Sequence, residues 1–233
     1  MENLIYRPLD LVQRSEDWLA WRTKGIGASE ASVIMGSLPF EYEDILELYK
    51  KKAGLPVKEF EMNAAIQKGI DTEDEALEAF TKITNVEALP KCFTHPVHTF
   101  LRASLDGITE DLKQGVEIKC SGASRFYEAK KGHVLPYYYT QMQQQMACTG
   151  LESIYYWMYR TKEGGVLIKV PRNEEYINEL IRRAGIFWDK VVNEEPCLPR
   201  HIGSDMWKEY ADPFEAGDMS TEFIGHYKNE APK

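Results

Sequence analysis

Apolar residues recur at helical spacing through the first part of the chain. One helix is predicted to begin after Ser15, a typical N-cap residue, and to end at Gly25. A short second helix follows a glycine-flanked turn and ends at Gly36. Two more helices are predicted at 43–53 and 61–82. This part of the chain therefore indicates a layer of helices.

The pattern changes at Val86, where short segments rich in β-branched and aromatic residues begin. Strands are predicted at 91–95, 98–104, 115–120, 153–160 and 165–170, and helices at 123–131, 137–149 and 173–192. This order favours an α/β fold with a central mixed β-sheet flanked by helices. Periodicity fades after Pro199, so we expect one domain over 1–199 and a tail or arm over 200–233.

Composition narrows the class of protein. Of the 233 residues 43% are hydrophobic and 28% charged, and no apolar run approaches the ~20 residues of a membrane helix. The N-terminus lacks the pattern of a secretory signal, so we expect a cytoplasmic protein. The four cysteines are widely spaced, which favours free thiols over a zinc or iron–sulfur site. The net charge of −9 is unlike that of a DNA-coating protein but leaves metal-dependent chemistry open.

The strongest chemical signal is a pair of carboxylates on neighbouring strands. Asp106 is expected at the end of one strand, and the strand 115–120 carries Glu117 and Lys119. Side chains alternate along a strand, so Glu117 and Lys119 share one face, and a hairpin would bring Asp106 beside Glu117. Carboxylate oxygens are suited to Mg²⁺, and the backbone carbonyl of Ile118 adds another oxygen.

A metal ion bound by these groups would activate water near neutral pH and stabilise the charge that develops on a phosphate. Lys119 would orient that water or help to deprotonate it, and would offset phosphate charge. A Glu-x-Lys tripeptide alone is better explained as a surface ion pair. The added Asp-Gly after a strand makes metal-assisted hydrolysis of a phosphodiester the better interpretation.

Four segments, in order, resemble the lambda exonuclease family of YqaJ-type viral recombinases. They are Trp21-Arg22 with Gly25-Ile26-Gly27-Ala28-Ser29-Glu30, then Gly69 with Glu73 and Ala76, then Ser104-Leu105-Asp106-Gly107 with Glu117-Ile118-Lys119-Cys120, and Tyr138 with Gln141-Met142-Gln143 and Met146. The Asp…Glu-x-Lys set is also similar to the signature of restriction-endonuclease-like nucleases. Leu105 and Ser121 stand where the family often has proline, and neither change removes a chemical group.

The resemblance implies roles for further residues. It places Glu73 at the metal, directly or through water, although its acidic neighbours alone would indicate a solvated helix face. Gln141 is expected to hold a water or phosphate oxygen beside the metal, whereas an exposed helix explains Gln143 equally well. Trp18 and Trp21 are more typical of packing than of contact with DNA bases.

A second site is expected where a glycine-flanked turn enters a helix, because free N–H groups there favour an anion. The resemblance implies that Arg22 and Ser29 bind a terminal 5′-phosphate in this turn, with Ser104 joining them. The alternatives are plain N-capping by Ser29, and a surface salt bridge from Arg22 to Asp17 or Glu30.

The family implies a Mg²⁺-dependent 5′→3′ exonuclease that digests linear duplex DNA from 5′-phosphorylated ends and leaves 3′ single strands for phage-type recombination by strand annealing. Two Mg²⁺ ions are expected, with Mn²⁺ able to substitute. The family also implies a homotrimeric ring, a single-strand annealing protein as partner, and a bacterial or phage-infected cytoplasm. Two alternatives stay open: an endonuclease or RecB-like nuclease of the same fold, and a non-catalytic protein that binds DNA ends.

Overall fold

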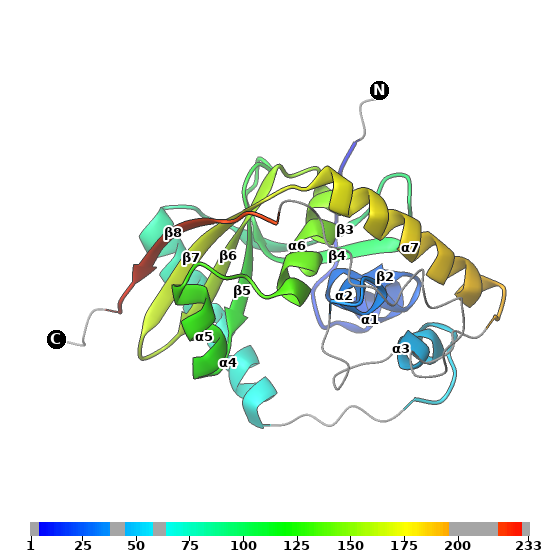
Figure 1. The fold of residues 1–233 in the computed structure, drawn as a ribbon, viewed down its shortest axis with the longest axis horizontal. Coiled ribbons are helices and arrows are strands. Elements are labelled where there is room, and N and C mark those ends of the chain that lie inside the picture. The colour runs from blue at the N-terminus through cyan, green and yellow to red at the C-terminus, as the bar shows by residue number, and fades with distance from the viewer. Residues whose placement is uncertain (1–4, 38–44, 58–63, 196–218, 230–233) are drawn as a thin grey trace.

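A computed structural model describes residues 5–37, 45–57, 64–195 and 219–229, which form a sheet with helices on both sides (Figure 1). The strands are β1 (Pro8–Leu9), β2 (Ile26–Gly27), β3 (Leu89–Thr94), β4 (Leu101–Ile108), β5 (Gly115–Cys120), β6 (Ser153–Arg160), β7 (Gly164–Pro171) and β8 (Glu222–Tyr227). The helices are α1 (Glu16–Thr23), the 3₁₀ helix η1 (Ala28–Glu30), α2 (Ala31–Ile34), α3 (Ile45–Lys52), α4 (Ala64–Thr84), α5 (Ala123–Lys130), α6 (Pro136–Thr149) and α7 (Glu174–Val192).

The sheet is mixed, as the sequence predicted. Its strands follow the order β1-β3-β4-β5-β6-β7-β8, and β2 pairs with β4. Neighbours along this order are antiparallel except β5 and β6, which are parallel. Parallel strands need a long crossover connection, which α5 and α6 supply here. This crossover brings α6 against the middle of the sheet, beside β4 and β5.

The alternation predicted along β5 is confirmed. Val116 and Ile118 belong to a buried cluster with Ala76 and Phe80 of α4. Glu117 instead contacts α6, through a hydrogen bond from the Gln141 side chain. Helices α4 and α6 therefore meet opposite faces of β5, and the acidic face is the one that α6 covers.

Strand β4 begins three residues later and ends four residues later than the strand predicted at 98–104, so Asp106 lies in the strand interior and not at its end. Gly107, which the sequence analysis placed after the strand, pairs with Val116 of β5. A Cβ at Gly107 would lie 2.8 Å from Val116 Cγ1 and 2.9 Å from Ala88 Cβ. The glycine therefore serves close packing within the sheet, and the hairpin turns a few residues later.

Helix α6 differs from the sequence interpretation in its burial. The exposed helix suggested for Gln143 is wrong, because this side chain is buried and donates to the Pro171 carbonyl at 2.9 Å. Gln144 is buried as well and donates to the carbonyls of Ile26 and Arg102, at 2.8 and 3.0 Å. Buried amides need such partners, so the glutamine run ties α6 to the backbone around it.

The segment 200–233 was expected to be a tail or arm, but its described part, 219–229, contains strand β8. This strand pairs antiparallel with β7 and so extends the sheet. The aromatic residues of the expected tail that precede it, Trp207, Tyr210 and Phe214, lie outside the described residues. The sheet therefore reaches beyond the domain boundary that the sequence suggested.

The cysteines Cys92, Cys120 and Cys148 are free thiols, as expected, and Cys197 lies outside the described residues. Within the described ranges, the helices lack the combination of length and apolar character needed to cross a membrane.

Candidate active site

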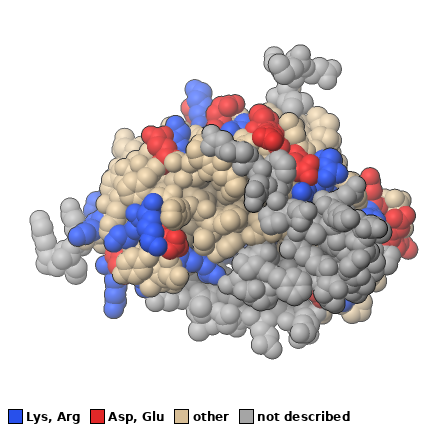
Figure 2. Space-filling model, viewed as in Figure 1, with Lys and Arg blue, Asp and Glu red and all other residues tan. Residues whose placement is uncertain are grey.

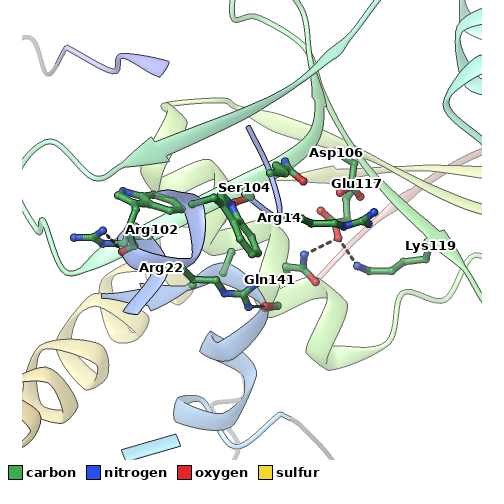
Figure 3. A pocket seen from close by; sticks show the side chains of 14 residues that line it. Arg14, Arg22, Arg102, Ser104, Asp106, Glu117, Lys119 and Gln141 are labelled. Atoms are coloured by element: carbon green, nitrogen blue, oxygen red, sulfur yellow. Dashed lines mark hydrogen bonds and ion pairs between the residues drawn. The ribbon is translucent and has the colours of Figure 1, made fainter. Parts of the chain in front are cut away.

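Most predicted site residues of both groups line a single pocket, although Glu73 and Ile118 do not (Figure 3). Its walls come from the segment before α1 and from α1, β2, η1, β4, β5 and α6. The lining residues are Gln13, Arg14, Trp18, Trp21, Arg22, Gly27, Ala28, Ser29, Arg102, Ser104, Asp106, Glu117, Lys119 and Gln141. Asp106, Glu117 and Lys119 lie toward one end, Arg22 and Arg102 lie toward the other, and Ser104 lies between them. The structure thus brings together the predicted hydrolytic and anion-binding residues.

The carboxylate pair is assembled by the pairing of β4 with β5. Asp106 Oδ2 accepts the backbone N–H of Ile118 at 2.7 Å, so this side chain reaches across to β5. Burial raises the pKa of Asp106 to about 8, and the neighbouring charge of Glu117 contributes to this rise against the opposing effect of Lys119. Two carboxylates that repel each other in this way form a place where a cation is stabilised.

Three side-chain donors hold Glu117, which is 1% exposed. Its Oε1 accepts from Lys119 Nζ and, at 2.6 Å, from Gln141 Nε2. Its Oε2 accepts from Gln145 Nε2 at 2.5 Å. Sequence reasoning missed Gln145, although its position four residues after Gln141 places both amides on one face of α6. The buried carboxylate is therefore fixed in orientation by α6 and by its own strand.

Lys119 lies between the carboxylates and an aromatic ring. Its Nζ is 5.2 Å from the centre of the Tyr138 ring. Burial lowers the pKa of Lys119, but the charges of Glu117 and Asp106 outweigh this effect and raise it above its usual value. The lysine is accordingly a cation at neutral pH, suited to attracting a phosphate or orienting a water.

The predicted ligands can be compared with what Mg²⁺ requires. Across the described residues, no three His, Cys, Asp or Glu side chains gather as a metal-binding group. Mg²⁺ usually binds one or two carboxylates and keeps several waters, which Asp106 and Glu117 satisfy. Glu73 does not line the pocket; it pairs with Arg14 at 2.5 Å, yet its charge contributes to the raised pKa of Asp106. The residues present therefore fit a hydrated Mg²⁺ better than a metal enclosed by protein ligands.

The opposite end of the pocket is built around Arg22. Its Nη2 donates to Ser29 Oγ at 2.7 Å, and its guanidinium lies 5.0 Å from the centre of the Trp18 ring. Trp18 Nε1 in turn donates to Ser104 Oγ at 2.9 Å. The salt bridge considered from sequence, Arg22 to Glu30, also exists at 3.9 Å. Arg22, Ser29 and Ser104 are thus linked through Trp18, which packs here as expected.

Sequence reasoning overlooked Arg102, which also lines the pocket. Its guanidinium lies 5.1 Å from the Trp21 ring centre and donates to the Trp21 carbonyl. The sequence does indicate a place for Arg102 in the site. Arg102, Ser104 and Asp106 occupy every second position of β4, so their side chains share one face of the strand. This strand alone therefore spans the pocket from its cationic end to its acidic end.

The chain is similar in sequence to known proteins. The family model described as the YqaJ-like viral recombinase domain matches residues 17–152. The chain is 27% identical over 209 residues to the uncharacterized protein YqaJ of Bacillus subtilis (strain 168), an alignment that covers 84% of this chain and 61% of YqaJ. The chain therefore spans about three fifths of that relative's length.

Solved structures with the same fold include an alkaline exonuclease, LHK-Exo, from Laribacter hongkongensis, with a TM-score of 0.67 and 26% identity. This match covers 78% of the chain and 94% of LHK-Exo, and the same enzyme in complex with dAMP gives a TM-score of 0.66. A phage-related exonuclease from Haemophilus somnus 129PT, at 16% identity and a TM-score of 0.55, shares the fold over 73% of this chain and 96% of its own. The expected restriction-endonuclease-like core is thereby confirmed.

Proposed function

The chain belongs to the YqaJ-like viral recombinase family, and from this membership and the pocket we propose that it is a DNA exonuclease. The observation that carries the proposal is the presence of Asp106, Glu117 and Lys119 in one pocket with Arg22 and Ser29. A buried carboxylate pair is suited to metal-assisted hydrolysis, and an arginine beside a hydroxyl is suited to a phosphate. The structural similarity to LHK-Exo, an alkaline exonuclease, supports the same activity.

The proposal includes direction and substrate. We infer that the protein digests linear duplex DNA 5′→3′ from phosphorylated ends. The terminal 5′-phosphate would bind Arg22, Ser29 and Ser104, while the adjoining phosphodiester would reach Asp106 and Glu117. The linkage of Arg22, Ser29 and Ser104 through Trp18 supports this arrangement.

The chemistry requires Mg²⁺, and we propose two ions, with Mn²⁺ able to substitute. Asp106, Glu117 and the Ile118 carbonyl would hold them, with Glu73 acting directly or through water. When bound, they supply a Lewis acid that makes water nucleophilic near neutral pH and stabilises charge on phosphate oxygens. Gln141 and Gln145 keep the Glu117 carboxylate oriented. Lys119, as a cation, orients the attacking water and offsets phosphate charge.

We further propose that the protein works as a homotrimer in the cytoplasm of a bacterial or phage-infected cell. The 3′ single strand that it leaves would pass to a single-strand annealing protein. Family membership supports these proposals, since the viral recombinase domain matches more than half of the chain.

The proposal is tested with matched substrates of one sequence: linear duplex with 5′-phosphate, linear duplex with 5′-hydroxyl, and covalently closed circular duplex. We expect Mg²⁺-dependent release of nucleotides from the phosphorylated linear duplex, slower release from the hydroxyl form, none from the circle, and no release in EDTA. Cutting of the circle would identify an endonuclease instead. Tight end binding without hydrolysis would identify a non-catalytic end-binding protein.

A further inference from the structure

A buried ion pair lies behind the Arg22 end of the pocket. Glu30 of η1 is 3% exposed, and the Lys52 side chain of α3 is 1% exposed. Lys52 Nζ lies 2.6 Å from Glu30 Oε2. Replacing a buried ion pair with apolar residues is often neutral or stabilising, so stability alone gives little reason for this pair. Its contacts point to another role.

The pair holds the segment that carries Arg22 from two directions. Lys52 Nζ also donates to the Arg22 backbone carbonyl at 3.1 Å. Glu30 Oε2 accepts the Gly27 N–H at 2.7 Å, and Glu30 Oε1 lies 3.9 Å from Arg22 Nη2 and 3.1 Å from Lys51 Nζ. The main chain of Arg22 is therefore held by a hydrogen bond from Lys52, and its guanidinium is attracted by a longer ion pair with Glu30.

Arg22 packs closely against the turn at Gly27. A Cβ on Gly27 would lie 3.2 Å from Glu30 Oε2 and 3.3 Å from Arg22 Nε. On its other side the guanidinium lies over the Trp18 ring. The ion pair, the bare glycine and the indole thus border the planar guanidinium, which donates to Ser29.

The charges in this cluster do not cancel. Burial raises the pKa of Glu30, but Lys52, Arg22 and Lys51 together lower it below its usual value, so the carboxylate is ionised. Lys51, Lys52 and Arg22 then surround one carboxylate, and Arg22 is the one of these three cations that lines the pocket. The Glu30 carboxylate alone would repel a phosphate. Surrounded by three cations, it instead orients Arg22, and the cluster as a whole still favours an incoming anion.

We propose that Glu30 and Lys52 are positioning residues that hold Arg22 for binding a terminal 5′-phosphate, and so set the preference for phosphorylated DNA ends. This inference rests on the proposed function and deepens it. It assigns a part in end recognition to α3, whose residues do not line the pocket.

The test measures binding, so that it does not depend on hydrolysis. The dissociation constants of two short duplexes, identical except for a 5′-phosphate or a 5′-hydroxyl, are measured in EDTA by fluorescence anisotropy. Their ratio is the phosphate preference. Glu30→Gln and Lys52→Met should lower the ratio about tenfold, the equivalent of one charge-assisted hydrogen bond, while Lys52→Arg should keep it.

The double variant Glu30→Gln/Lys52→Met separates positioning from stability. It removes both buried charges, so its melting temperature should recover relative to either single variant while the preference stays low. Glu179→Gln is a matched control, because Glu179 also holds two arginines, Arg182 and Arg183, but lies on α7 outside the pocket. This control should keep the full preference.

Two outcomes would overturn the inference, and they have different consequences for the proposed function. A full preference in folded Glu30→Gln or in the double variant would show that Arg22 needs no such support, and would leave the exonuclease proposal intact. Equal binding of both duplexes by the unsubstituted protein would overturn recognition of the 5′-phosphate itself.

Discussion

At the scale of single residues, the pocket depends on side chains that hold other side chains. Glu117 is buried, and its orientation is set by Lys119, Gln141 and Gln145. Asp106 and Glu117 could be predicted from sequence because strand alternation and an Asp-Gly pair are visible locally. Gln145 was harder to recognise, because its role depends on how α6 docks against β5, which no local pattern specifies.

Gln145→Met tests this support. The substitution removes a donor to buried Glu117, and loss of such an outer partner typically lowers activity by about 10- to 100-fold. Gln143→Met is the control, since Gln143 is equally buried but donates to the Pro171 carbonyl. Rates of Mg²⁺-dependent hydrolysis and thermal midpoints are compared for both. Equal rates in the two variants at equal stability would contradict a special role for Gln145.

The protonation of Asp106 leads to a prediction about pH. Burial and the charge of Glu117 raise the pKa of Asp106 to about 8, so below that pH its carboxyl holds a proton. A cation must displace this proton, and the apparent affinity for Mg²⁺ should therefore rise with pH, by up to about tenfold per unit, and level off above about pH 8. Calorimetric titration between about pH 6 and pH 9 measures this, and an affinity constant across that range would contradict it.

At the scale of elements, long helices and strands could be predicted closely because their periodicity is carried by many residues. The predicted strands at 115–120 and 153–160 coincide with β5 and β6. The two-residue strands β1 and β2 were missed, since two residues carry no period. Strand β8 was missed for another reason: its exposure does not alternate, and its pairing with distant β7 includes a register shift.

Two glycines that differ in the space around their Cα atoms allow the described packing to be tested by alanine substitution. A Cβ at Gly165 in β7 would overlap the Trp157 ring, whereas at Gly185 in α7 the nearest described atom is Phe100 Cζ at 3.7 Å. Gly165→Ala should therefore destabilise by at least about 2 kcal/mol, because the indole is fully buried. Gly185→Ala should stabilise by about 0.5–1 kcal/mol through helix propensity. Chemical denaturation measures both, and shifts of the same sign would contradict the packing described.

At the scale of the whole molecule, charge is distributed unevenly. Figure 2 shows Lys and Arg side chains gathered over α5, and Asp and Glu side chains interspersed with Lys and Arg along α7. The first turn of α7 contributes Glu174 and Glu175, and the last turn of α5 contributes Lys130. A net charge of −9 is thus compatible with a pocket that has a cationic end, because the overall charge does not describe any one surface.

Strand β8 also affects the molecule as a whole, because it connects parts of the chain that are distant in sequence. Asn229, just beyond β8, donates to the Tyr159 hydroxyl at 2.9 Å, and Tyr159 donates to Glu75 of α4 at 2.7 Å. Truncation before residue 219 should lower the melting temperature by at least about 5 °C, since it exposes the edge of β7 and removes this network. Differential scanning calorimetry measures the change. An unchanged melting temperature would favour the independent tail expected from sequence.

The central claim, metal-assisted hydrolysis at the carboxylate pair, is tested most directly with Asp106→Asn. This nearly isosteric change keeps an oxygen that can accept the Ile118 N–H but removes the charge. Single-turnover hydrolysis of a 5′-phosphorylated linear duplex in Mg²⁺ is measured alongside binding of the same duplex in EDTA. We predict unchanged binding and loss of hydrolysis by at least about 1000-fold, in line with a catalytic metal site. Mg²⁺-dependent hydrolysis retained in the folded variant would contradict the account.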